Sequence, residues 1–226
     1  MGIWSEYAQF FGEFRRNFNQ TGAILPSGAF LAGALVRPLR GSRPPGRILE
    51  VGPGTGSVTR AIARVMRIGD RLDAVEINAR FARALRDRIA RDPLFEPFRG
   101  DVEVITAPVQ ELIGESVYDY IVSGLPLNNF SGADVRSIFR TFTRLLKPGG
   151  ALTYFEYSLV RHLKVPFVSR AERRRLFRVG RLVSHYIRRH QVRRERIFLN
   201  VPPAVVRTLQ LKPVPCGALT QVVSCG

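Results

Sequence analysis

Strand-like and helix-like patterns of apolar residues alternate along this chain from about residue 47 onward. Short apolar runs with the composition of strands are separated by segments in which apolar residues follow helical spacing. Such alternation is typical of an α/β protein in which helices cover both faces of a mostly parallel sheet. The expected strands are residues 47–49, 72–77, 102–106, 117–123 and 151–157, and the expected helices are residues 57–66, 78–90 and 131–146.

Particular residues mark some boundaries of these elements. Asn78 has the side chain of a helix N-cap, and the K-P-G-G sequence at residues 147–150 is expected to stop the helix that precedes it. Near the end of the chain, residues 196–200 and 205–211 flank a pair of prolines. We expect these two segments to form an antiparallel pair that closes the sheet.

The first residues of the chain follow a different pattern. Apolar and unusually aromatic side chains recur at i, i+3, i+4 and i+7, with polar residues largely on the opposite side. We expect an amphipathic helix within residues 1–20, followed by a single domain at residues 21–226. This helix could lie in a membrane interface or simply pack on the core. Its apolar face consists of Ile3, Trp4, Tyr7, Phe10, Phe11, Phe14 and Phe18.

The chain is strongly basic, with 35 Lys and Arg residues, 18 Asp and Glu residues and a formal net charge of +17. Residues 161–196 alone hold 13 basic residues and two acids. We expect this stretch to be a basic helical insertion at about residues 160–195. The charge favours a polyanionic partner, either nucleic acid or an anionic membrane surface. A solvated charged face is the alternative.

Cysteine usage and hydropathy indicate the cellular compartment in which the protein is expected to work. Cys216 and Cys225 fit neither a metal site nor a disulfide framework, so a reducing cytosol is the default and we expect no metal. No apolar run is long enough to span a bilayer. The N-terminus lacks the basic and apolar regions of a signal peptide.

A glycine-rich turn carries the clearest chemistry. The sequence E-V-G-P-G-T-G at residues 50–56 follows the first expected strand. Its spacing is G-x-G-x-G, which differs from the G-x-G-x-x-G that seats a dinucleotide pyrophosphate. Because Glu50 precedes the glycines, the turn suits a ligand with a positively charged end.

A second acid completes this pattern. Glu76 closes the second expected strand, twenty residues past Gly56, and its carboxylate could accept both hydroxyls of a ribose. With these residues in place, the chain resembles class I S-adenosylmethionine-dependent methyltransferases. The resemblance implies a Rossmann-like fold with a mostly parallel seven-stranded sheet, a final antiparallel strand, and S-adenosylmethionine as cofactor.

The resemblance also implies where the cofactor lies. Its methionine end would be near the glycine turn, its ribose on Glu76, and its adenine after the third strand, where Pro108 stands in place of the family's usual Asp. The loop after the fourth strand and a segment upstream of the sheet would complete the site. The expected cofactor-binding residues are Ala23, Pro26, Ser27, Glu50, Gly52, Gly54, Thr55, Gly56, Glu76, Ile77, Pro108, Val109, Ser123, Gly124 and Leu125.

The loop after the fourth strand bears on the substrate. It reads S-G-L-P-L-N-N-F at residues 123–130, without the (N/D/S)-P-P-(Y/F/W) signature of many nucleic-acid amino methyltransferases. This loop resembles that of bacterial phospholipid N-methyltransferases, as do F-F-G-E-F-R-R at 10–16, T-G-A-I-L-P-S at 21–27 and N-V-P-P-A at 200–204. The resemblance covers about residues 7–207. It implies successive methylation of phosphatidylethanolamine toward phosphatidylcholine by a peripheral enzyme on the inner face of the cell membrane.

Methyl transfer to an amine needs positioning and removal of a proton. Aromatic rings could also stabilise a methylated ammonium by cation–π contact, and arginines could bind the head-group phosphate bidentately. The candidate catalytic residues are Tyr7, Asn128, Glu156, Tyr157 and His185, and the candidate phosphate ligands are Arg181, Tyr186 and Arg188. The expected partners are an anionic membrane surface and a phospholipid rather than nucleic acid, and a monomer is the default.

Other functions remain open at this stage. An RNA adenine N6-dimethyltransferase would explain the basic charge, although the S-G-L-P sequence lacks the aromatic residue on which a flipped base stacks. A non-catalytic membrane- or RNA-binding module on a methyltransferase fold is a second alternative. The intact glycine turn and the two glutamates favour a working cofactor site.

Overall fold

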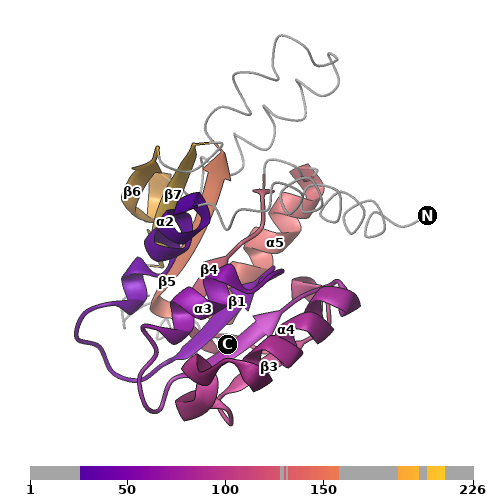
Figure 1. The fold of residues 1–226 in the computed structure, drawn as a ribbon. Helices are drawn as coiled ribbons and strands as arrows, with labels where there is room; N and C mark the ends of the chain where they lie inside the picture. Colours follow the sequence, from indigo (N-terminus) through magenta and orange to yellow (C-terminus); the bar gives the residue numbers. More distant parts are fainter. Residues whose placement is uncertain (1–25, 128–129, 131, 158–187, 199–202, 212–226) are drawn as a thin grey trace, which may run out of the picture.

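The computed structural model describes residues 26–127, 130, 132–157, 188–198 and 203–211. A seven-stranded sheet runs through this part of the chain in the order β3-β2-β1-β4-β5-β7-β6 (Figure 1). Its strands are β1 (Arg47–Val51), β2 (Arg71–Val75), β3 (Val102–Ile105), β4 (Tyr118–Ser123), β5 (Leu146–Tyr157), β6 (Gln191–Ile197) and β7 (Ala204–Gln210).

Strand direction in this sheet follows the expectation from sequence. Strands β1 to β5 are parallel, and β7 is antiparallel to both β5 and β6. The order reverses between β1 and β4, where β1 pairs with β2 on one side and β4 on the other. Ligands of open α/β sheets bind at the carboxyl ends of the strands at such a reversal. The topology therefore fixes the edge of the sheet at which a site is expected.

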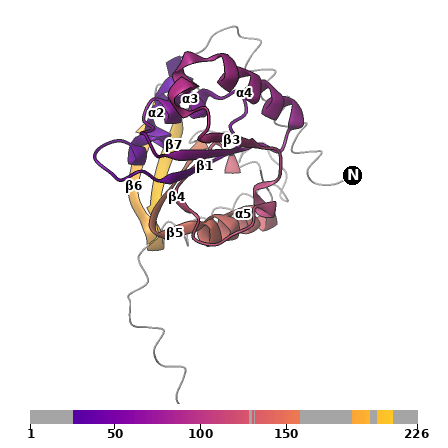
Figure 2. The same ribbon diagram turned by 90° about the horizontal axis from the view of Figure 1, so that it is seen from below.

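Helices cover both faces of the sheet. Figure 2 shows α3 and α4 on one side of the strands and α5 on the other, and α2 packs beside α3. Two short 3-10 helices precede β1 and β3, and a third precedes β4. The helices are α2 (Pro26–Leu35), α3 (Ser57–Ala63), α4 (Ala79–Arg91) and α5 (Gly132–Leu145), and the 3-10 helices are η1 (Arg37–Leu39), η2 (Pro93–Phe98) and η3 (Val109–Glu111).

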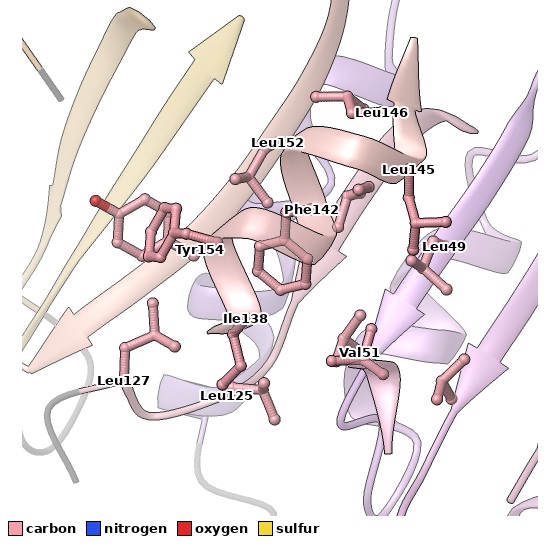
Figure 3. Packing of buried hydrophobic residues seen from close by; sticks show 14 of the residues in the cluster. Leu49, Val51, Leu125, Leu127, Ile138, Phe142, Leu145, Leu146, Leu152 and Tyr154 are labelled. Carbon is pink, nitrogen blue, oxygen red and sulfur yellow. The ribbon is translucent and has the colours of Figure 1, made fainter. Parts of the chain in front are cut away.

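The apolar core divides between the two faces because successive residues of a strand point in opposite directions. In β1, Leu49 packs with α5, whereas Ile48 packs with α2 and α3. Figure 3 shows Ile138 and Phe142 of α5 beside side chains of the central strands. All but the first residue of β1 and of β2 are buried, as expected for parallel strands covered on both faces.

The predicted N-cap of α4 is confirmed, α3 ends at Ala63 rather than at residue 66, and two strands differ in length from the prediction. Asn78 caps α4 by accepting hydrogen bonds from the amides of Arg80 (3.0 Å) and Phe81 (3.3 Å). Helix α5 ends at Leu145, but β5 already begins at Leu146, which pairs with Tyr118 before the register shifts. The K-P-G-G segment is thus part of an irregular first section of β5.

The second difference concerns the basic stretch. Strand β6 begins at Gln191, so residues 191–195, which we expected at the end of a helical insertion, form a strand instead. The reason is that β6 is an edge strand that pairs only with β7. Arginines are common on exposed edges and hide the apolar alternation that identifies buried strands. The expected helix within residues 1–20 and most of the insertion lie outside the described residues.

Ion pairs hold the edge at which the parallel strands begin. Both oxygens of buried Asp70 accept hydrogen bonds from Arg43 (2.7 and 2.5 Å), and the backbone amides of Gly46 and Arg67 add two more at 2.8 Å. These bonds join the loop before β1 to the turn before β2. Two further pairs lie nearby, Asp73 with Arg47 (2.8 Å) and Asp119 with Lys147 (2.8 Å).

Candidate cofactor site

The glycine turn connects β1 to α3 at the carboxyl edge of the sheet. All three of its glycines have positive φ. A Cβ on Gly52 (φ +72°) would lie 2.6 Å from Leu125, and one on Gly124 would lie 2.8 Å from the carbonyl oxygen of Gly52. The amide of Gly124 also donates to Val51 O at 2.8 Å. Glycine at both positions therefore lets the ends of β1 and β4 approach closely.

Glu76 follows β2 directly and is 3% exposed. One of its carboxylate oxygens accepts a hydrogen bond from Gly54 N (3.0 Å) and the other from Asn78 N (3.0 Å). Both oxygens of the Glu76 carboxylate are thus oriented by backbone amides, and a carboxylate can accept about four hydrogen bonds in all. The two amides hold the carboxylate beside the glycine turn.

Glu50 is fully buried in β1, one residue before the strand ends. It points to the face that α2 and α3 cover, because its neighbours in the sequence, Leu49 and Val51, belong to the core on the α5 side. A buried carboxylate is costly unless polar or charged groups compensate it. Its position at the reversal of strand order suits the positively charged methionine end of the cofactor.

A largely apolar pocket begins at Glu76 and extends toward α5. Ile77, Val109 and Leu125 form part of its wall, with Gln110 as a polar group. The apolar lining of this pocket, next to Glu76, is of the kind that can pack against an adenine ring. The complete lining is Val51, Gly52, Val75, Glu76, Ile77, Ala107, Pro108, Val109, Gln110, Leu125, Phe130 and Ile138.

The structure brings together most of the cofactor residues expected from sequence. Gly52, Glu76, Ile77, Pro108, Val109 and Leu125 line the pocket, and Gly54 contacts Glu76. Thr55 and Gly56 instead face α4: Arg88 donates a hydrogen bond to Thr55 O, and a Cβ on Gly56 would lie 2.9 Å from Leu85. Ser123 is fully buried at the end of β4, and its hydroxyl accepts a hydrogen bond from Leu125 N at 3.4 Å.

The candidate catalytic residues that are described lie at the end of β5. Glu156 forms an ion pair with Arg207 of β7 (3.3 Å), and Tyr157 packs edge-on against Phe155 at 5.0 Å between ring centroids. Adjacent residues of a strand point to opposite faces, so Glu156 and Tyr157 do not converge on one point. The candidates Tyr7, Asn128 and His185 lie outside the described residues.

The remaining candidates are dispersed. Arg188 is exposed and precedes β6, toward the edge where the parallel strands begin, so the structure does not bring it to the cofactor residues. Pro26 and Ser27 begin α2, but their side chains are not described. Ala23, Arg181 and Tyr186 lie outside the described residues.

Sequence reasoning missed several residues of this region. Asn78 was expected only as a cap, yet its amide also holds Glu76. Phe130 and Ile138 line the pocket, and the spacing of apolar residues in the helix at 131–146 was the available signal for Ile138. Arg207 interrupts an apolar strand, V-V-R-T-L at residues 205–209, and that interruption could have identified it.

Within the described residues, no group of three or more His, Cys, Asp and Glu side chains could hold a metal ion. None of the described helices has the length and apolar character needed to cross a membrane.

Comparison with known proteins agrees with this geometry. A family model described as "Methyltransferase domain" matches residues 48–150. An ornithine lipid N-methyltransferase of Singulisphaera acidiphila is 32% identical over 147 residues, which are 64% of this chain and 74% of that protein. The ubiquinone/menaquinone biosynthesis C-methyltransferase UbiE of Ectopseudomonas mendocina is 29% identical over 121 residues, 53% of this chain and 45% of that protein.

The fold is also similar to solved structures. The O-methyltransferase TomG of Streptomyces achromogenes, solved in complex with SAM, matches with a TM-score of 0.59 and 18% identity, covering 82% of this chain and 80% of that one. The chain belongs to the class I S-adenosylmethionine-dependent methyltransferases, and S-adenosylmethionine is its cofactor.

Proposed function

We propose that this methyltransferase acts on the amine of a membrane lipid head group. The observation that carries the proposal is the 32% identity with a protein named ornithine lipid N-methyltransferase. The motifs that resemble phospholipid N-methyltransferases support phosphatidylethanolamine and its mono- and dimethylated forms as substrates, leading to phosphatidylcholine. Ethanolamine and ornithine head groups share the same acceptor, a primary amine on a short flexible arm.

The loop after β4 supports an aliphatic amine as acceptor. Leu125 and Leu127 are buried there, and Phe130 lies in the wall of the cofactor pocket. The described residues of this loop thus offer no exposed aromatic ring on which a flipped base could stack. An amine on a flexible arm needs no such platform, but it must be held in line with the methyl group.

Different described residues would bind the cofactor and take the proton from the amine. When bound, S-adenosylmethionine supplies a methyl group on a positively charged sulfur. Glu50 and Glu76 would hold its charged end and its ribose. The amine attacks in its neutral form, so its proton must leave. Glu156 is the described acid–base candidate at this edge of the sheet.

An anionic membrane surface is the partner that best fits the exposed charge. Arg193, Arg194 and Arg196 of β6 are exposed, and each can contribute about 1 kcal/mol of attraction near an anionic surface. Val192 and Phe198 on the same edge are 61% and 72% exposed. Strand β6 runs parallel to β5. Phe198, which follows β6, therefore lies at the carboxyl ends of the parallel strands, where the cofactor residues also lie. We propose a peripheral enzyme on the cytoplasmic face of the membrane.

Transfer of labelled methyl from S-adenosylmethionine tests the proposal. The acceptors are vesicles with phosphatidylethanolamine, vesicles with ornithine lipid, and structured RNA, each at equal ionic strength. We expect label in the lipid phase, and chromatography of the products gives the number of methyl groups added. Label in ornithine lipid alone would support the lipid amine and exclude phosphatidylethanolamine, whereas label in RNA alone would overturn the proposal.

A further inference from the structure

The ion pair between Glu156 and Arg207 lies at the edge of the sheet where the cofactor binds. Tyr154 of β5 is paired in register with Ser123, the last residue of β4, and Glu156 is two residues further along β5. At about 3.3 Å per residue, Glu156 therefore lies roughly 7 Å beyond the end of β4. Arg207 is opposite Tyr154 on β7 and reaches Glu156 at 3.3 Å.

The pair is accessible and is held in a defined orientation. The side chains of Glu156 and Arg207 are 24% and 15% exposed. Arg207 also donates a hydrogen bond to Gln191 of β6 at 2.7 Å, which fixes the guanidinium plane across three strands. Partly exposed ion pairs add little to stability, while a charged residue within the apolar strand β7 sacrifices apolar packing. Stability alone does not account for this pair.

A third polar group lies beside the pair. The Tyr154 hydroxyl is fully buried and has no hydrogen-bond partner among the described residues. Its ring packs edge-on against Phe139 at 5.6 Å, and the hydroxyl points away from the labelled apolar side chains (Figure 3). Burial, and then the nearby charge of Glu156, raise the pKa of Tyr154. The phenol therefore stays protonated and can donate a hydrogen bond.

An acid, a guanidinium and a phenol together match a head group that carries both charges. Ethanolamine phosphate carries an amine and a phosphate on one short arm, and an ornithine head group carries an amine and a carboxylate. The ammonium of either would lie against Glu156, and the anion would take the bidentate position on Arg207. Such a zwitterion can replace the internal contacts of the pair without leaving either charge unpaired.

We propose that Glu156 and Arg207, with the Tyr154 hydroxyl, form the subsite that binds the zwitterionic head group of the lipid substrate. The inference rests on the proposed function and names the feature by which the site selects its substrate: an amine and an anion on one arm. Arg207 was not among the phosphate ligands expected from sequence, which were Arg181, Tyr186 and Arg188; of these, Arg181 and Tyr186 lie outside the described residues.

The test varies the mole fraction of phosphatidylethanolamine in vesicles of constant surface charge and measures KM in the full-length enzyme. We expect Arg207→Gln and Glu156→Gln each to raise this KM about tenfold, as loss of one charge-assisted contact predicts. A long-chain alkylamine, which has no anionic group, serves as competitor. Its inhibition constant should rise in Glu156→Gln and stay unchanged in Arg207→Gln.

Arg37→Gln is the matched control. Arg37 forms a pair with Glu195 of β6 at 2.7 Å, and we expect no change in KM or in alkylamine inhibition when it is removed. The affinity for S-adenosylmethionine should be unchanged in all three variants. An unchanged lipid KM with a lowered melting temperature in Arg207→Gln would assign the pair a structural role and overturn the inference. Failure of the wild-type enzyme to methylate any lipid would instead overturn the proposed function.

Discussion

The two edges of the sheet use carboxylates in different ways. Where the parallel strands begin, Asp70 is neutralised by Arg43 while two backbone amides also donate to it, and Asp73 is neutralised by Arg47. Where the strands end, Glu76 is held by backbone amides of the glycine turn and of Asn78. Helices α3 and α4 start at this second edge, so amides and the positive ends of helix dipoles are available there. A carboxylate positioned by amides can present its oxygens to a ligand, whereas one neutralised by arginines joins segments of the protein.

The largest effect on stability is expected at the first edge. Asp70→Asn should lower the free energy of unfolding by about 3–5 kcal/mol, because it leaves buried Arg43 without its counter-charge. Urea unfolding at neutral pH measures this loss. Asp101→Asn, which removes an exposed pair with Arg71 at 4.0 Å, should cost less than about 1 kcal/mol. Equal losses in the two variants would contradict a special role for the buried pair.

The same variant predicts a pH dependence. Burial alone would raise the pKa of Asp70, but hydrogen bonds from Arg43 and from the amides of Arg67 and Gly46 lower it below its ordinary value. The stabilisation is therefore complete above the unfolded pKa of about 3.9 and is lost as the pH falls through the folded value. Wild-type stability should decline below about pH 4, and Asp70→Asn should decline less over the same range.

The next largest effect is expected at the second edge. Glu76→Ala should raise the dissociation constant for S-adenosylmethionine about 100-fold, since hydrogen bonds to charged groups contribute roughly 1.5–3 kcal/mol each. Isothermal titration calorimetry measures this constant. Glu76→Gln, which keeps the shape and one acceptor oxygen, should lose less affinity. An unchanged constant in Glu76→Ala would show that the ribose binds elsewhere.

The residues that could be predicted from sequence are those whose local pattern has one physical meaning. A few neighbouring residues are enough to recognise each of three features: glycines after a buried strand, an acid that closes the next strand, and an N-cap asparagine. The α/β class, the five parallel strands and the position of Glu76 followed from such patterns, whereas the seven-stranded sheet with a reversed final strand was implied by the family resemblance. Each of these patterns depends on neighbours along the chain.

Features that depend on contacts between residues far apart in the chain could not be predicted from the sequence. Strand β6 reads as a basic segment because only β7 pairs with it, and the pairing becomes visible only in the sheet. The Glu156–Arg207 contact joins residues 51 positions apart. In the sequence, Gly124 is only part of a loop motif. The structure shows why glycine is needed there: a Cβ at this position would collide with the carbonyl oxygen of Gly52. A single sequence does not show which residues of different strands contact each other.

The smallest effect is expected beside Glu76, at the cap of α4. Asn78→Ala should lower the free energy of unfolding by about 1 kcal/mol, the usual cost of losing a cap. The Asn78 amide that holds Glu76 belongs to the backbone and remains, so the affinity for S-adenosylmethionine should change far less than in Glu76→Ala. Asn78→Asp keeps an acceptor for the amides of Arg80 and Phe81 and should restore stability. If Asn78→Ala weakened cofactor binding as much as Glu76→Ala, the side-chain cap itself would be needed to position the carboxylate, and backbone amides would not suffice at this edge.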